Sequence, residues 1–366
     1  MECSQKLIWN KATRETLEKI TVEAPDEMLQ KRIRSNWDHV AKPLDGMGRF
    51  EALTAQIGAI QESEKPDVTK SVVIIMCADN GIVEEGISQS GQEVTLAVVK
   101  NMAKKQSSVG KMAELIGADT IPVDIGVNCR EKIPGVFDKK IREGTRNFRK
   151  TPAMTEEEAV RAILTGIEMV SDCKEKGYQI LATGEMGIGN TTTSSAVTAA
   201  LLACDVTDVT GRGAGLSDER LIHKQKVIAD AIEKYRLKGA DALQILQTVG
   251  GLDIGGLAGV CIGGAIYHIP IVLDGVISMA AALLAERIVP GTRAYLIASH
   301  KGKEAAAEPL AKQLELKPVL DADMALGEGT GAVMLLSLLK MALQVYQEGT
   351  TFLDIEVEQY ERYNKK

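Results

Sequence analysis

The chain has 366 residues, of which 45% are hydrophobic, 25% are charged and 4% are aromatic. A net charge of −7 and the scarcity of aromatic side chains argue against a nucleic-acid-binding protein that uses a basic surface or base stacking. No two of the six cysteines are spaced as CxxC, and no apolar run is long enough to span a membrane. We therefore expect a cytoplasmic protein with one large and one smaller domain, and without a zinc site, a disulfide framework, a membrane partner or a nucleic-acid partner.

The first part of the chain has the pattern of helices. Apolar residues recur at helical spacing over residues 26–37 and 48–60, within a helical region that we expect to begin near residue 11. Proline and glycine in residues 42–48 predict a turn between these two helices.

From residue 71 onward, short apolar runs alternate with helical segments. Such runs are typical of strands buried on both faces, and their alternation with helices predicts a parallel sheet that is covered on both faces. The expected strands span residues 71–77, 120–125, 179–182, 269–273, 294–297 and 318–320, and the expected helices include 93–115, 156–174, 194–202, 218–235, 278–287 and one that begins near Ala332.

Polar residues follow most of the expected strands. Ligands of such folds bind beyond the carboxyl ends of the strands, so these residues are the first candidates for a site. An aspartate at a strand end can also merely cap the next helix, and for any one of them both interpretations stay open. The candidates are Asp79, Asn80, Asp124, Glu185, Asp274, Ser299, His300 and the glycine-rich segment 326–331.

The most informative segment is GEMGIGNTTT at residues 184–193, between an expected strand and an expected helix. A strand, a glycine-rich turn and a helix together point free backbone N–H groups at an anion. The spacing of the glycines is similar to a P-loop, but Asn190 stands where a Walker lysine is needed. A dinucleotide fingerprint would have a third glycine where this chain has Thr192. The segment predicts a phosphate-binding turn for a mononucleotide, with a merely tight turn as the alternative.

Two charged residues outside this turn are further candidates. Lys224 falls on the expected helix 218–235, downstream of a flexible glycine loop that contains Gly213, and could neutralise a phosphate. Taken alone, this lysine would more often be a solvated surface charge.

Glu328 stands between Gly327 and Gly329, which leave its carboxylate unshielded by bulky neighbours. The plain alternative is an acidic residue favoured by the dipole at a helix N-terminus. Together with Glu185 it forms a possible pair of carboxylates whose environments separate their pKa values. The four histidines show no metal-ligand spacing, so we expect no metal site.

Several motifs together resemble one family. They occur in order along nearly the whole chain: KPLDGMGR at residues 42–49, ADNGIVEEG at 78–86, GEMGIGNTTT at 184–193, LDG at 273–275, SH at 299–300 and LGEGTGA at 326–332. With them the chain resembles the nicotinate-nucleotide:dimethylbenzimidazole phosphoribosyltransferases of cobamide assembly. The resemblance implies an enzyme that transfers phosphoribose from nicotinate mononucleotide to an aromatic lower-ligand base, giving an α-ribotide and nicotinate.

The resemblance also implies a fold, an assembly and residue roles. It implies a large α/β catalytic domain over residues 71–332, with a Rossmann-like parallel sheet and helices on both faces, and a small helical domain from residues 1–70 together with 333–366. It implies a dimer that needs no cofactor and no metal. Glu328 would be the general base, the phosphoribosyl and nucleotide part would be bound by Glu185, Gly187, Ile188, Gly189, Asn190, Thr191, Gly213, Lys224 and Asp274, and the acceptor would be bound by Asn80, Ser90, Val98, Leu326 and Gly327.

Two positions depart from the family pattern. Asn80 stands where members usually have histidine, and Val98 stands where members that use benzimidazole have glutamine, eight residues after Ser90. Loss of a long polar side chain makes the pocket less able to bind a ring nitrogen at that point. We therefore hypothesise an altered acceptor, such as phenol or p-cresol, and either a homodimer or a heterodimer with a paralogue. Two other functions stay open: another nucleotide phosphoribosyl-transfer enzyme, and a non-catalytic partner subunit of such an enzyme.

Overall fold

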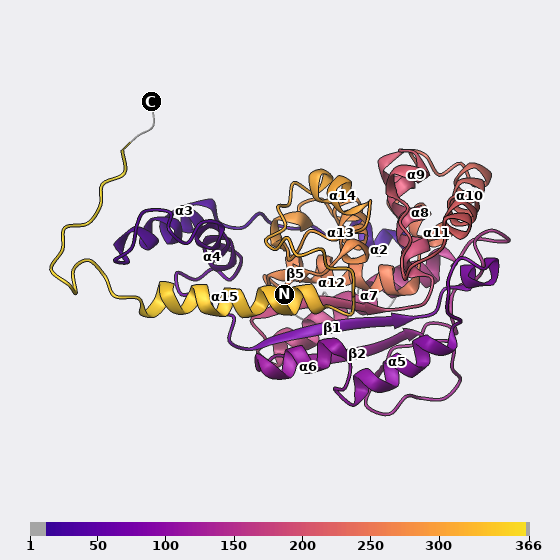
Figure 1. Ribbon diagram of the computed structural model, residues 1–366, viewed down its shortest axis with the longest axis horizontal. Helices are drawn as coiled ribbons and strands as arrows, with labels where there is room; N and C mark the ends of the chain where they lie inside the picture. The colour runs from indigo at the N-terminus through magenta and orange to yellow at the C-terminus, as the bar shows by residue number, and fades with distance from the viewer. Residues whose placement is uncertain (1–11, 364–366) are drawn as a thin grey trace.

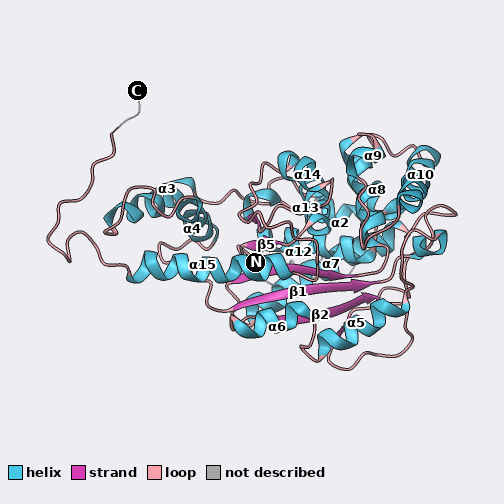
Figure 2. Cartoon of the chain, viewed as in Figure 1, coloured by secondary structure: helices cyan, strands magenta, loops and turns pink. Residues whose placement is uncertain are grey.

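The computed structural model describes residues 12–363, and Cys3 and the predicted helical start at residue 11 lie outside that range. Its centre is a six-stranded parallel sheet in the order β3-β2-β1-β4-β5-β6 (Figure 1). The strands are β1 (Ser71–Ala78), β2 (Asp119–Gly126), β3 (Phe137–Asp138), β4 (Ile180–Met186), β5 (Ile271–Leu273) and β6 (Leu296–Ala298). Helices cover both faces, so the predicted α/β fold is confirmed (Figure 2).

Strand β1 shows why a continuous apolar run forms the centre of this sheet. All eight of its residues are buried, and it pairs with β2 on one side and with β4 on the other. Successive side chains of a strand point to opposite faces, so β1 contributes to two separate hydrophobic cores. One core contains Val72, Ile74 and Met76, and the other contains Val73, Ile75 and Cys77.

The helices follow the strands in alternation. The α-helices are α2 (Arg14–Glu18), α3 (Glu27–Asn36), α4 (Arg49–Ile60), α5 (Glu93–Ala103), α6 (Ser108–Leu115), α7 (Glu156–Glu175), α8 (Asn190–Leu202), α9 (Val206–Val209), α10 (Asp218–Lys234), α11 (Ala242–Val249), α12 (Leu252–Ile266), α13 (Val276–Ile288), α14 (Ala307–Gln313) and α15 (Thr330–Glu348). Helices α7, α8, α11, α12 and α13 pack against one face, and α4, α5, α6 and α15 pack against the other.

Helix α12 lies closest to α7 because both present glycines at their contact. A Cβ atom at Gly166 would collide with the carbonyl oxygen of Gly256, and one at Gly259 would collide with that of Ile163. The two backbones therefore approach further than larger residues would permit. This packing holds the N-terminus of α12 beneath the carboxyl end of the sheet.

Two expectations about secondary structure were wrong, and one strand was not predicted. The single helix expected at 93–115 is two helices, α5 and α6, because Lys105 has a φ of 56° and the Ser107 side chain caps α6 by accepting from Gly110 N at 3.2 Å. Residues 318–320 form no strand: Leu320 makes only an isolated parallel bridge with His300. Strand β3, two exposed residues at the sheet edge, was not predicted because its burial pattern has no apolar periodicity.

Helices α3 and α4 lie beside the C-terminal half of α15, away from most of the sheet (Figure 1). The chain after α15 returns to this region, where Thr351 forms an antiparallel bridge with Val40. Helices α4 and α15 also share the core of one sheet face, through side chains such as Ile57 and Leu335. The division into residues 1–70 with 333–366 and residues 71–332 stays a prediction.

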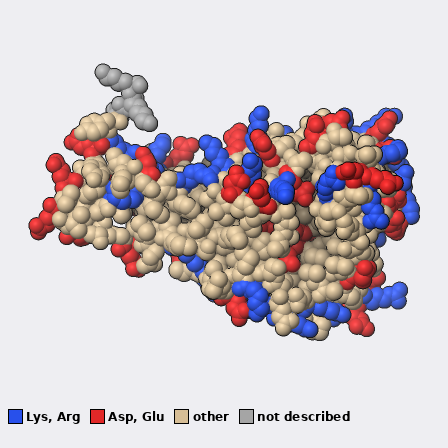
Figure 3. All heavy atoms as spheres, viewed as in Figure 1, with Lys and Arg blue, Asp and Glu red and all other residues tan. Residues whose placement is uncertain are grey.

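Charged side chains of both signs are interspersed over the face drawn in Figure 3. An area with few charges follows the course of α15. Within residues 12–363, no helix combines the length and the apolar character that a membrane crossing requires.

Candidate active site

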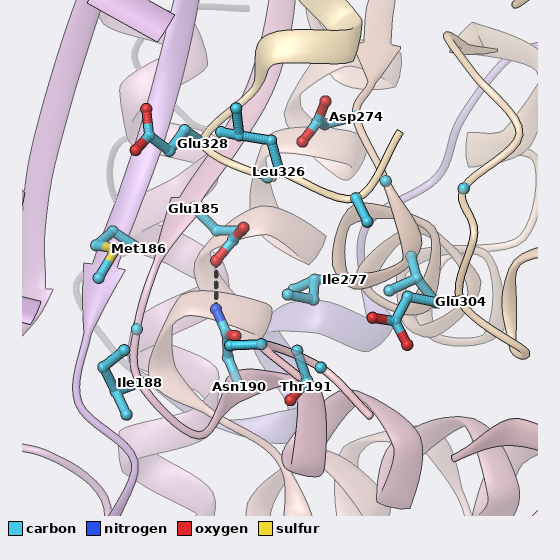
Figure 4. A pocket seen from close by; sticks show the side chains of 18 of the residues that line it. Glu185, Met186, Ile188, Asn190, Thr191, Asp274, Ile277, Glu304, Leu326 and Glu328 are labelled. Carbon is cyan, nitrogen blue, oxygen red and sulfur yellow. Dashed lines mark hydrogen bonds between the residues drawn. The ribbon is translucent and has the colours of Figure 1, made fainter. Parts of the chain in front are cut away.

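A pocket of about 340 Å³ opens beyond the carboxyl ends of β4 and β5 (Figure 4). Its wall comes from four segments that are distant in the sequence but adjacent in space. They are residues 185–191 at the end of β4 and in the turn that follows, residues 274–278 after β5, residues 300–304 after β6 and the loop 324–328 before α15. Further contributions come from 87–89, Val98 and 212–216. The location agrees with the rule that ligands of parallel sheets bind at this edge.

The turn between β4 and α8 is built around glycines with definite roles. Gly189 is the N-cap of α8 with a φ of 93°, a left-handed conformation that favours glycine. A Cβ atom at Gly187 would collide with the carbonyl oxygen of Ala78, so only glycine fits against the end of β1. The turn thereby opens the N-terminus of α8 toward the pocket, as an anion site requires.

Two buried carboxyl groups lie beneath this turn. Asn190 donates through Nδ2 both to Glu185 Oε2 and, at 3.2 Å, to Asp253 Oδ2 (Figure 4). Burial, with the nearby Asp253 charge as a second cause, raises the pKa of Glu185 to about 8. Burial likewise raises the pKa of Asp253 to about 7. The pair therefore holds at least one proton at neutral pH, because two adjacent buried charges would repel each other.

A second glycine turn precedes α15 and faces the first. Gly327, Glu328 and Gly329 have φ values of 85°, 63° and 101°, three left-handed residues in succession. The buried carboxylate of Asp274 holds this turn: it accepts from Gly329 N at 3.1 Å and from Gly331 N at 2.9 Å. Burial raises the pKa of Asp274.

The second turn also packs directly on β4. A Cβ atom at Gly184 would collide with the carbonyl oxygen of Glu328. A glutamate at a φ of 63° is an uncommon conformation, held here by Asp274 on one side and by β4 on the other. Residue 184 is therefore glycine because the backbone of the turn at residues 327–329 occupies the space that a side chain would need.

The carboxylate of Glu328 is placed differently from that of Glu185. Glu328 is half-buried, and its Oε2 accepts from Val109 N, near the start of α6, at 3.1 Å. Figure 4 shows the two carboxylates pointing in different directions, with Glu185 toward Asn190 and Glu328 away from it. Within residues 12–363, Oε1 of Glu328 has no hydrogen-bond partner.

Lys224 lies behind the pocket wall. Its Nζ donates to Thr191 Oγ1 at 3.0 Å and to the carbonyl oxygen of Gly211 at 3.2 Å. The side chain is buried, and burial lowers the pKa of Lys224 to about 8. Gly213, with a φ of 53°, packs on the same threonine. A buried ammonium with only neutral hydrogen-bond partners stands ready for an anion.

His300 completes the wall on the β6 side. Its Nδ1 lies 2.9 Å from Ser299 Oγ, and the side chain is buried. A Cβ atom at Gly331 would collide with the imidazole ring, so this glycine makes room for the histidine. The negative charge of Asp274 lies close enough for the two groups to interact electrostatically.

The comparisons with known proteins agree with this geometry. A family model described as phosphoribosyltransferase matches residues 22–357. The chain belongs to this family. A nicotinate-nucleotide–dimethylbenzimidazole phosphoribosyltransferase of Clostridium acetobutylicum is 42% identical over 335 residues, 92% of this chain and 95% of the relative. One of Chloroflexus aggregans is 41% identical over 333 residues, 91% of this chain and 94% of the relative.

Solved structures are similar as well. The crystal structure of CobT from Thermus thermophilus has a TM-score of 0.86 and 36% identity, and the match covers 90% of this chain and 99% of that one. The resemblance drawn from the motifs is thereby confirmed, and the chain is a phosphoribosyltransferase, that is, a pentosyltransferase.

Most of the predicted site residues of this phosphoribosyltransferase line the pocket described above. They are Glu185, Gly187, Ile188, Gly189, Asn190, Thr191, Gly213, Asp274, Val98, Leu326, Gly327 and Glu328. Asn80, Ser90 and Lys224 are not among the lining residues.

Each of these three lies just outside the pocket. Asn80 is fully buried beneath the glycine turn, 3.5 Å from the carbonyl oxygen of Ile188. Ser90 is half-buried, and Ser88 and Gln89 line the pocket in its place. The spacing of residues in the sequence does not show which of the neighbouring residues 88–90 faces the pocket.

Sequence reasoning missed Asp253, and also Met186, Arg212 and Glu304 of the wall. A signal for Asp253 existed, since it is a single acid within a glycine-rich apolar run. Within residues 12–363, no three His, Cys, Asp or Glu side chains are grouped so as to hold a metal ion.

Proposed function

We propose that this phosphoribosyltransferase moves the phosphoribosyl group of nicotinate mononucleotide to an aromatic lower-ligand base, and releases nicotinate and an α-ribotide. The observation that carries the proposal is one pocket with an anion-binding helix N-terminus at Asn190 on one side and the Glu328 carboxylate on the other. The names of the relatives, which state this donor and the base dimethylbenzimidazole, support it.

The departure of nicotinate requires little catalytic assistance from the protein. The bond between C1′ and the pyridinium nitrogen breaks, and its electron pair neutralises the positive charge of the ring. Because nicotinate leaves with an uncharged ring, no general acid is needed. The acceptor attacks C1′ from the opposite face, and this inversion turns the β-linkage of the donor into an α-linkage.

The acceptor must lose a proton as its bond to C1′ forms. We assign this proton to Glu328, whose Oε1 has no partner within the described residues 12–363. The hydrogen bond from Val109 N holds the other oxygen and orients the carboxylate. The left-handed backbone at Glu328 supports the assignment, because strained residues cluster at functional sites.

The phosphate of the donor would bind at the N-terminus of α8, beside Thr191 and Gly213, which both line the pocket. Lys224 lies behind Thr191, and its Nζ donates a hydrogen bond to Thr191 Oγ1. It would act on the phosphate as a buried positive charge through this threonine, rather than as part of the open wall. Glu185, Asn190 and Asp274 would frame the ribose.

Two acceptor classes are possible for this pocket, and one observation favours the second. The lining of the pocket includes the apolar side chains Ile87, Val98, Met186, Ile188 and Leu326. A benzimidazole is supported by the names of the relatives, which state dimethylbenzimidazole as the base. A phenol or p-cresol needs no polar partner at residue 98, where this chain has valine, and its hydroxyl proton would also go to Glu328.

The test incubates the purified protein with nicotinate mononucleotide and either benzimidazole or phenol, and identifies the products by mass. Release of nicotinate with either acceptor supports the transfer, and a phenolic ribotide supports the broader acceptor range. A benzimidazole product alone would remove the phenolic proposal. Nucleotide binding without turnover for any acceptor would favour a non-catalytic partner subunit.

We also propose that the enzyme works as a dimer, either with itself or with a paralogue. Helix α15 carries the exposed apolar side chains Met334 and Met341, and the exposed Leu326 lies on the wall of the pocket. Light scattering after gel filtration gives the mass of the purified protein. A monomer at micromolar concentration would point to the paralogue as the partner.

A further inference from the structure

A buried carboxylate lies beneath the lining of the pocket and has no role in the proposed reaction. Asp253 is the second residue of α12, is fully buried and is not part of the pocket lining. Its Oδ1 accepts from Ile254 N at 3.0 Å, and its Oδ2 accepts from Asn190 Nδ2 at 3.2 Å. The same nitrogen donates to Glu185 Oε2, so one amide joins two buried carboxyl groups.

This double contact decides which way the Asn190 amide faces. The NH₂ group has two hydrogens, one for each carboxyl group, whereas the amide oxygen has none to donate. A reversed amide would set its oxygen against both Glu185 and Asp253, which requires a proton on each of them. Figure 4 shows the nitrogen on the side of Glu185 and the oxygen turned away from it.

The amide oxygen that results is available to a ligand. Asn190 lines the pocket, and Oδ1 has no hydrogen-bond partner within the described residues 12–363. Nor is Oδ1 among the buried polar atoms that lack a partner in that part of the chain, so the pocket reaches it. A neutral amide oxygen accepts hydrogen bonds and donates none, so it selects a hydroxyl or N–H donor.

Close packing keeps Asp253 in this position. A Cβ atom at Gly187 would lie 3.0 Å from Asp253 Oδ2, and one at Gly251 would collide with Asp253 Oδ1. Two glycines from different segments therefore enclose the carboxylate. One of them belongs to the turn after β4, so the same carboxylate supports both the turn and the amide.

We propose that Asp253 is a positioning residue that holds the Asn190 amide with its oxygen toward the pocket, where it accepts a hydrogen bond from a ribose hydroxyl group of the nucleotide. The donor offers two such groups, at C2′ and C3′, and neither its phosphate nor its carboxylate can donate. The inference rests on the proposed function, since it takes a ribonucleotide as the ligand.

The test compares the affinities of nicotinate mononucleotide and its 2′-deoxy and 3′-deoxy analogues by calorimetry, for the wild type and Asp253→Asn. Asparagine has one oxygen, so it cannot accept from both Ile254 N and the Asn190 amide. The wild type should prefer the ribonucleotide over at least one analogue by about tenfold to a hundredfold. Asp253→Asn should remove most of that preference.

Asp124→Asn is the matched control. Like Asp253, Asp124 is a buried carboxylate outside the pocket lining, but it lies near the end of β2, accepts from Val127 N at 2.9 Å and pairs with Lys140. Its substitution should lower thermal stability and leave the preference for ribonucleotide unchanged. If Asp253→Asn does not fold, Asp253→Ser and Asn190→Ala carry the same comparison, because the first shortens the support and the second removes the amide.

The outcomes separate the two proposals. Equal loss of affinity for all three nucleotides in Asp253→Asn would mean a merely structural role and would overturn the inference. A wild type that binds and uses nicotinate mononucleotide but shows no preference over either analogue would overturn the inference and leave the proposed function standing. A wild type that does not bind this nucleotide at all would overturn both.

Discussion

The two glycine turns face each other over one pocket, but one buries its carboxylate and the other leaves its carboxylate half-buried. The turn after β4 buries Glu185 against Asn190 and Asp253, and burial raises the pKa of this glutamate to about 8. The turn before α15 leaves Glu328 half-buried, held by one backbone hydrogen bond from Val109. A carboxylate engaged on both sides suits binding, and one with a free oxygen at the pocket suits proton transfer.

The position of a carboxylate in the fold, rather than the motif that contains it, separates the two roles. Both glutamates stand among glycines in the sequence. Only the fold shows that one turn encloses its acid and that the other is itself held by a third acid, Asp274. Four predictions test this difference.

The largest effect is expected for Glu328→Gln. Removal of the base should lower turnover about a hundredfold to ten-thousandfold, because the acceptor proton then has no positioned acceptor. Donor affinity should change little, since Glu328 does not engage the α8 side of the pocket. Steady-state kinetics and calorimetry with nicotinate mononucleotide measure the two quantities. Unchanged turnover would remove Glu328 as the base.

Asp274→Ala should collapse the second turn. The substitution leaves the N–H groups of Gly329 and Gly331 without their acceptor, so the free energy of unfolding should fall by on the order of 3 kcal/mol and turnover should fall with it. Denaturant titration measures the first quantity. Asp26→Ala, which removes a solvent-exposed cap at α3, should cost about 1 kcal/mol and leave turnover intact. Equal effects of the two variants would contradict a special role of Asp274.

Lys224→Met should act on the first turn alone. Loss of the buried charge behind Thr191 should raise the KM for nicotinate mononucleotide about tenfold with a smaller change in kcat. Because burial lowers the pKa of Lys224 to about 8, the wild-type KM should rise above that pH, and the variant should lack this rise. Lys226→Met, an exposed lysine paired with Asp230, is the control and should match the wild type.

The smallest effect concerns the pH dependence of stability. Burial raises the pKa of Glu185 from 4.5 to about 8, so between these values the folded state binds a proton that the unfolded state has lost. This contribution is complete below pH 4.5 and is lost as the pH rises through about 8. Glu185→Gln should therefore flatten the decline of Tm between pH 5 and pH 9. An unchanged slope would mean that Glu185 is ionised in the native pocket.

Much of the site could be predicted because its motifs depend on local geometry. A glycine turn between an apolar run and a helix specifies strand, turn and helix N-terminus within ten residues. The confirmed sheet places the ends of β4 and β5 side by side, so Glu185 and Asp274 could be expected in one place. Glu328 was predicted from its glycines and from the family resemblance.

The differences between the predictions and the structure share a physical cause. The break at Lys105 depends on one left-handed residue and a serine cap within an otherwise helical pattern. The path of a loop decides that Ser88 and Gln89, and not Ser90, line the pocket. Asp253 was missed because its partner Asn190 is 63 residues away and no local pattern links them.

The sequence by itself determined the parallel α/β fold, the glycine turn after β4 and the identity of both glutamates, because hydrophobic period and glycine spacing act over a few residues. Tertiary structure alone decided which glutamate is enclosed, why Gly184 must lack a side chain and how Asp253 turns the Asn190 amide. Those features depend on contacts between segments far apart in the chain. The burial that raises the pKa of Glu185, Asp253 and Asp274 exists only once those contacts are formed.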